Sequence, residues 1–173
     1  MKTKLSIAAI LFLTLFSGCK KPGIHFRINH QATFRVEAGA PLNLPFEVGT
    51  PDVTTNSSAQ FENNNTAANL IKEIKLEELK LTITNPSNKT FSFLKSIHIY
   101  ISTNSGDEIE LAGMNNIAST AQTITLNATT QDLSKYVKAS SYKLRTSVVT
   151  KETLTQPIDV RTDIKFKVRA SVL

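Results

Sequence analysis

The feature that most constrains the fold is a strict two-residue alternation along the last part of the chain. One set of alternate positions is apolar or small: Val160, Thr162, Ile164, Phe166, Val168, Ala170 and Val172. The intervening positions are polar or charged: Arg161, Asp163, Lys165, Lys167, Arg169 and Ser171. Side chains of a strand point alternately to its two faces, whereas the 3.6-residue period of a helix would scatter these apolar residues. The pattern therefore predicts a long strand with one buried face.

The same alternation recurs along most of the chain. It predicts further strands at Ile24–Ile28, Thr33–Val36, Leu42–Val48, Leu76–Thr84, Ile97–Ser102, Glu108–Ala112, Thr123–Leu126 and Tyr142–Val149. Turn residues 104–107 make the pair 97–102 and 108–112 a hairpin. Helix is scarce: Asp132 is placed to cap one turn over Leu133–Val137, and 66–72 is either a short helix or the lead into a strand.

These elements predict an all-β fold, a single antiparallel β-sandwich of about seven to nine strands, with a closed barrel as the alternative. Residues 52–69 are polar, rich in Asn and Thr, and almost without apolar content apart from Phe61. This composition predicts a long polar loop with few buried contacts that moves freely.

The N-terminus has the pattern of an export signal. Lys2 and Lys4 are followed by Leu5–Phe16, an uncharged and mostly apolar run. A membrane-spanning helix needs about 20 apolar residues, whereas the apolar region of a secretory signal has about 7–15. Small residues then precede the single cysteine of the chain, Cys19. We therefore expect residues 1–18 to be a signal peptide.

Phe16-Ser17-Gly18-Cys19 resembles the lipobox of bacterial lipoproteins, although Phe16 stands where that class prefers Leu. The resemblance implies acylation of Cys19, removal of 1–18, a lipidated tether at 19–23 and a sandwich domain at 24–173. Two or more acyl chains suffice for stable attachment to a membrane. Lys20 and Lys21 replace the acidic residues that mark other destinations in this class, which implies the periplasmic face of the outer membrane. An ordinary signal peptide followed by a buried cysteine is the alternative.

A second resemblance concerns the fold. Leu79–Pro86 (LKLTITNP) is similar to the strand and Asn-Pro opening of the late embryogenesis abundant type 2 (WHy) domains. The resemblance covers about residues 76–138 and implies an immunoglobulin-like sandwich. The whole mature chain resembles uncharacterised immunoglobulin-like sandwich lipoproteins of Gram-negative envelopes.

Positive charge is concentrated near the C-terminus. The chain has a net charge of +6, and residues 135–173 carry nine basic and three acidic side chains. One interpretation is a solvated outer strand face. The other is a basic patch that attracts another envelope protein or an anionic membrane surface, formed by Lys143, Arg145, Lys165, Lys167 and Arg169. No nucleic-acid-binding motif accompanies this charge.

Metal chemistry is not indicated by the three histidines. His25 and His30 are five residues apart, so on one strand they would face opposite ways, and His98 lies opposite the isoleucines of its strand. Each is interpreted as a surface or edge histidine. Zinc needs three or four ligands at set geometry, so we expect no metal and no cofactor.

Catalysis and sugar binding have only weak candidates. Asp107, Glu108 and Glu110 cluster on a predicted hairpin, where charge usually serves solubility. Tyr100 and Tyr136 are the candidate aromatic platforms. We predict no catalytic residues and a non-catalytic, lipid-anchored interaction or structural module of the cell envelope. The alternatives are an accessory lipoprotein that binds sugar or lipid for an uptake system and, less favoured, a hydrolase.

Overall fold

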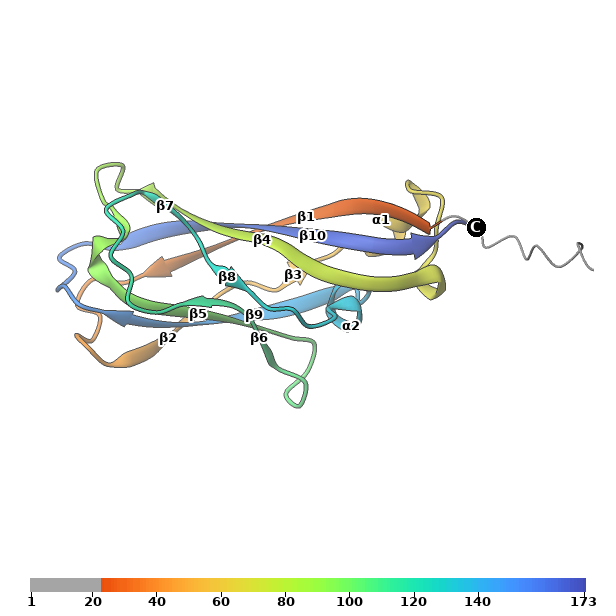
Figure 1. Ribbon diagram of the computed structural model, residues 1–173. Helices are drawn as coiled ribbons and strands as arrows, with labels where there is room; N and C mark the ends of the chain where they lie inside the picture. The colour runs from red at the N-terminus through yellow and green to blue at the C-terminus, as the bar shows by residue number, and fades with distance from the viewer. Residues whose placement is uncertain (1–22) are drawn as a thin grey trace, which may run out of the picture.

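The computed structural model describes residues 23–173, which form two antiparallel β-sheets packed face to face (Figure 1). The predicted signal peptide 1–18 and the lipidation site Cys19 lie outside the described residues. Sheet A has the strand order β1 (Gly23–Val36), β10 (Ile158–Ser171), β4 (Ile71–Asn85) and β7 (Thr123–Thr125). Sheet B has the order β2 (Pro45–Gly49), β9 (Ser141–Thr150), β5 (Leu94–Ser102), β6 (Ile109–Met114) and β8 (Asn127–Ala128), and β3 (Val53–Thr54) also pairs with β9.

The antiparallel sandwich is confirmed, and β10 is the strand that the C-terminal alternation predicts. Its apolar positions are buried between the sheets, while its charged positions lie on the outer face of sheet A. Fully buried side chains from both sheets form one core, including Phe166 of β10, Leu79 and Leu81 of β4, and Ile97 and Ile99 of β5. The described residues contain β1 to β10, more strands than the predicted seven to nine.

Several predicted strand boundaries differ from the structure, among them the start of 42–48, which is observed as β2 from Pro45, and in β1 and β4 polar residues interrupt the apolar pattern. Strands 24–28 and 33–36 are one continuous strand, β1, since His30 occupies a buried inward position there. β4 starts at Ile71 rather than Leu76. Lys165 of β10 pairs with Glu78, and the next residue, Phe166, pairs with Leu76, so Glu77 is an extra, bulged residue. The bulge shifts the alternation of the β4 residues that precede it, which hides them from the pattern.

Residues 52–69 are not the long mobile loop that their composition predicts. They contain β3, α1 (Ser57–Glu62) and a 3-10 turn, η1 (Ala68–Leu70). Phe61 is only 1% exposed. The hydroxyl of Thr55 donates to the carbonyl of Ala139 at 2.5 Å, and that of Thr66 to the carbonyl of Ser171 at 2.6 Å. Polar side chains thus dock this segment onto the sandwich by hydrogen bonds to backbone, a role that hydrophobicity does not reveal.

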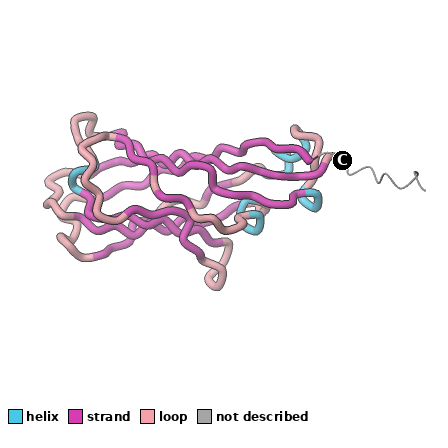
Figure 2. The backbone as a smooth tube through the Cα atoms, in the orientation of Figure 1, coloured by secondary structure: helices cyan, strands magenta, loops and turns pink. Residues whose placement is uncertain are grey.

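The remaining helical segments are short and lie toward the ends of the sandwich (Figure 2). These are η2 (Phe91–Phe93) and α2 (Ser134–Val137), the latter within the predicted turn. Asp132 Oδ1 accepts the backbone N–H groups of Ser134 and Ile74, each at 3.0 Å. The helix begins at Ser134, with Leu133 rather than Asp132 at its N-cap, and Asp132 ties this turn to β4.

Candidate functional site

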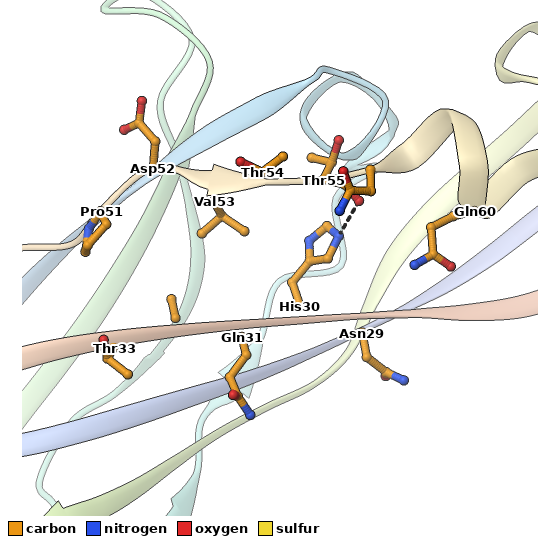
Figure 3. Close-up of a pocket in the computed structure, with 12 residues that line it drawn as sticks. Asn29, His30, Gln31, Thr33, Pro51, Asp52, Val53, Thr54, Thr55 and Gln60 are labelled. Carbon is orange, nitrogen blue, oxygen red and sulfur yellow. Dashed lines mark hydrogen bonds between the residues drawn. The ribbon is translucent and has the colours of Figure 1, made fainter.

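An open cleft of about 410 Å³ lies beside β1. β1 is the edge strand of sheet A. Residues 29–33 of β1 form one wall, and residues 51–56 with Gln60 form the other (Figure 3). The cleft therefore lies where the edge strand of sheet A faces β3, the short strand beside β9. Its lining offers amides, hydroxyls and the backbone of a strand edge rather than an apolar pocket.

His30 leaves β1 on the inward side and reaches across to the other sheet (Figure 3). It is 9% exposed, so the prediction of a surface histidine is wrong for this residue, although it does lie on an edge strand. Its Nε2 lies 3.2 Å from the carbonyl oxygen of Thr55, and its Nδ1 lies 2.8 Å from the hydroxyl oxygen of Tyr142. A carbonyl can only accept, so Nε2 carries the proton, and Nδ1 accepts from the tyrosine hydroxyl.

The environment of His30 favours the neutral ring. Burial is the main cause that lowers its pKa, and the Thr55 carbonyl opposes that shift. Burial also raises the pKa of Tyr142, so its hydroxyl keeps its proton. Phe166 meets the imidazole edge-on, with ring centroids 5.6 Å apart. Both ring nitrogens are used in bonds within the fold, and the arrangement works as a cross-link between β1, β9 and the segment after β3.

The other two histidines lie where the alternation places them. His25 is exposed on the outer face of β1, on the opposite side from His30. His98 lies on the outer face of sheet B, and its Nδ1 is 2.9 Å from Glu110 Oε1. Among residues 23–173, no group of three or more His, Cys, Asp or Glu side chains is arranged to hold a metal ion.

The five residues proposed as one basic patch are divided between opposite faces of the molecule. Lys143 and Arg145 point outward from β9 in sheet B, whereas Lys165, Lys167 and Arg169 point outward from β10 in sheet A. The prediction of a single patch is therefore wrong. The alternation correctly gave the outward direction of each side chain, but it does not say which sheet a strand joins.

Acidic neighbours also pair with most of these basic groups. On sheet A, Lys165 Nζ lies 3.3 Å from Glu78, and Arg169 lies 3.5 Å from Glu73. A hydrogen bond from Arg27, with smaller contributions from the charges of Lys165 and Lys167, lowers the pKa of Glu77. On the outer face of sheet A, basic side chains of one strand thus lie beside acidic side chains of another.

Arg145 is the centre of the most connected polar cluster on sheet B. Its guanidinium donates to both carboxylate oxygens of Glu108, at 2.6 and 2.9 Å, and to Glu47 at 2.8 Å. It also lies over the ring of Tyr100, 4.1 Å from the centroid. The Glu108 pair lowers the pKa of that carboxyl and raises that of Arg145. A platform for sugar stacking at Tyr100 is therefore covered by the arginine.

The remaining candidates serve the fold. Tyr136 is 5% exposed, and its hydroxyl donates to the carbonyl of Asp107 at 2.6 Å. The Asp107 carboxylate accepts backbone N–H groups of Thr103 and Asn104, which closes the predicted turn of the β5–β6 hairpin. Hydrogen bonds from Thr103, Lys135 and these amides hold the pKa of Asp107 well below its usual range. Asp107, Glu108 and Glu110 therefore face three different partners.

No helix among residues 23–173 is long and apolar enough to span a membrane. No protein-family model and no curated protein matches the sequence. Several solved viral structures match this chain at low similarity. The BFDV capsid protein in its 60-mer form matches with a TM-score of 0.45 and 12% identity, over 88% of this chain and 95% of that chain. The structure of Desmodium yellow mottle tymovirus matches with a TM-score of 0.31 and 11% identity, over 88% of this chain and 90% of that chain. The structure of Cocksfoot mottle virus matches with a TM-score of 0.31 and 10% identity, over 92% of each chain. At these TM-scores we infer nothing further from the likeness.

Proposed function

We propose that this chain is a lipid-anchored protein of the bacterial cell envelope whose β-sandwich acts as a non-catalytic interaction or structural module. The observation that carries the proposal is the sequence Phe16-Ser17-Gly18-Cys19, which follows a basic start and an apolar run. The destination is the outer membrane, facing the periplasm.

The position of β1 is consistent with an anchor at Cys19. The described sandwich begins at Gly23, which pairs with Ser171 near the C-terminus, so the chain enters and leaves the domain at the same end (Figure 1). The anchoring cysteine thus precedes β1 by only residues 20–22. With one cysteine in the sequence, the domain has no disulfide within the chain and depends on its packed core.

The polar clusters favour a module that binds through its surface. Both ring nitrogens of His30 take part in hydrogen bonds within the fold, and Arg145 donates hydrogen bonds to Glu47 and Glu108. These are stabilising roles rather than the nucleophile-and-base arrangement of an active site. The extended strand β1 and the two charged outer sheet faces are the surfaces available for partners.

The test is to express the full chain in a Gram-negative host with an alkyne analogue of palmitate. The mature protein should incorporate the label, begin at Cys19 by mass spectrometry, and stay with membranes after a high-salt wash. Cys19→Ala should lose the label and the membrane association. Phe16→Leu is the matched control, because it restores the residue that the class prefers and should leave processing intact.

Two results would overturn the proposal. One is a mature protein that retains residues 1–18. The other is equal membrane association of the parent chain and Cys19→Ala after the salt wash.

A further inference from the structure

The outer faces of the two sheets differ in charge. The strands of sheet A direct eight basic and five acidic side chains outward: Arg27, Arg35, Lys75, Lys80, Arg161, Lys165, Lys167 and Arg169, with Glu73, Glu77, Glu78, Asp159 and Asp163. The outer face of sheet B carries three of each sign: Lys95, Lys143 and Arg145, with Glu47, Glu108 and Glu110. Sheet A therefore has a net positive outer face, whereas that of sheet B is balanced.

Ion pairs within sheet A leave this positive excess in place. Glu73 is shared by Lys75 and Arg169, and each of the other four carboxylates pairs with one cation. Lys80 and Lys167 have no carboxylate at salt-bridge distance among the described residues. Lys167 also lies directly opposite Lys75 in the pairing of β10 with β4. The charge of these lysines is available to an anionic surface.

The proposed acyl anchor at Cys19 selects a bilayer as that surface. Gly23 follows Cys19 by four residue steps, and an extended chain spans about 3.3–3.6 Å per residue, so the tether reaches about 13–14 Å. The headgroup layer of one leaflet is about 5–8 Å thick. The start of β1, at one end of sheet A, is therefore held within about 10 Å of the headgroups (Figure 1).

The length of the tether also distinguishes the two sheets. Packed sheets lie about 10 Å apart, so with sheet B on the headgroups Gly23 would lie at least about 15–18 Å above the acyl chains. The tether cannot reach that far, whereas with sheet A on the headgroups the spacing between the sheets is not added. An end-on orientation is within reach, but segment 62–72 beside the tether has only Glu62 and Lys72, which are of opposite charge.

We propose that the anchored domain lies with the outer face of sheet A on an anionic bilayer, with Lys80 and Lys167 directed at the lipid phosphates. The proposal rests on the proposed function, because the acylated tether is what holds this face at the membrane. Each Lys or Arg near an anionic surface adds to the attraction. Since the anchor already keeps the domain at the bilayer, a small excess of charge is enough to set its orientation.

Fluorescent labels on single cysteines distinguish the orientations. The acylated full chain is reconstituted in vesicles of phosphatidylethanolamine and phosphatidylglycerol that contain a lipid with a quencher on its headgroup. Acylated Cys19 has no free thiol, so the label goes to the substituted position. His25→Cys reports the anchored end, and Thr33→Cys reports the outer face of sheet A about 33 Å further along β1. Ser147→Cys, on the outer face of β9 in sheet B, is the matched control.

We expect quenching at His25→Cys and Thr33→Cys and none at Ser147→Cys. An end-on domain would instead give quenching at His25→Cys alone. Replacing both lipids by phosphatidylcholine should abolish the quenching at Thr33→Cys and keep that at His25→Cys, because the anchor remains while the anionic charge is lost.

Charge variants test the face itself, with the label at Thr33→Cys. Lys80→Gln combined with Lys167→Gln should lower the ratio of the sheet A orientation to all others by about 10- to 30-fold. Lys95→Gln combined with Lys143→Gln removes the same charge from sheet B and should leave the quenching unchanged.

Three results would overturn the orientation and leave the proposed anchor intact. The first is an unquenched label at Thr33→Cys while that at His25→Cys is quenched. The second is an equal effect of the two pairs of charge substitutions. The third is a label at Thr33→Cys that is shielded in isolated envelopes but not in these vesicles, since a protein would then be the occupant. A chain that takes the label at Cys19 and does not associate with vesicles would contradict the proposed function and the orientation together.

Discussion

Removing the hydroxyl of Tyr142 should destabilise the fold by leaving one buried nitrogen of His30 without a partner. In Tyr142→Phe the ring stays in the core, where Tyr142 is 1% exposed, and only the donor to Nδ1 is lost. His30 cannot recover by moving its proton to Nδ1, because Nε2 would then present a lone pair to the Thr55 carbonyl 3.2 Å away. The single lost atom therefore leaves an unsatisfied polar group inside the sandwich.

An unsatisfied buried polar group costs about 1–3 kcal/mol. For a domain of this size each kcal/mol lowers Tm by about 2–4 °C, so Tyr142→Phe should melt about 2–12 °C below the parent chain. Circular dichroism at pH 8 measures this shift. His30→Leu and the double variant complete a thermodynamic cycle, and two groups in one hydrogen bond should show a coupling of about 0.5–3 kcal/mol. A Tm unchanged in Tyr142→Phe, or a coupling energy of zero, would refute the assigned tautomer and the bond.

Three further predictions follow from the same contacts. Burial lowers the pKa of His30 from 6.5, so the unfolded chain binds the proton more readily; the free energy of unfolding should fall below about pH 6.5 by up to about 1.4 kcal/mol per pH unit until the folded pKa is reached. Denaturant unfolding at a series of pH values measures this fall, and the unfolding midpoint of His30→Leu should not show it. Phe166→Ala removes a fully buried ring and should cost about 3–5 kcal/mol in urea unfolding, whereas a cost below 1 would mean that the core is not packed as described. Arg145→Ala should cost about 1 kcal/mol because its partners are partly exposed, while Lys143→Ala on the same strand should change stability by less than about 0.5; equal effects would contradict the cluster.

Much of the fold is predictable from local patterning. The alternation in β10 and β9 identifies both strands and the direction of each side chain, because one face is apolar and the other charged. The β5–β6 hairpin follows from Asp107 and its neighbours, whose turn chemistry acts within a few residues. These features depend on short-range geometry that the sequence records directly.

The missed features depend on contacts between distant segments. His30 resembles a surface residue until Tyr142, more than a hundred positions later in the chain, supplies its partner. The polar segment 52–69 is ordered by bonds to Ala139 and Ser171, and its single apolar anchor, Phe61, was the available signal. The basic residues were grouped by closeness in sequence, but the strand order places β9 and β10 in different sheets. No periodicity within a segment specifies these pairings.

The position of His30 connects the attachment of β1 to the opposite sheet with pH. It is the inward-facing polar residue at the middle of β1, next to Asn29, and its bonds to Tyr142 and Thr55 hold this edge strand to the opposite sheet. Tyr142 faces the ring from β9, Phe166 faces it from β10, and exposed Asp52 is the acidic group on the cleft wall. Protonation of Nδ1 would turn an acceptor into a second donor against a hydroxyl that then has no acceptor of its own. Acid should therefore loosen the centre of β1 before the sandwich unfolds as a whole, and the hydrogen-exchange protection factors of the β1 amides measure this loosening. Arg145→Ala, on the outer face of the other sheet, should leave this acid sensitivity unchanged, and a loss of β1 protection in acid that persists in His30→Leu would contradict the role of His30.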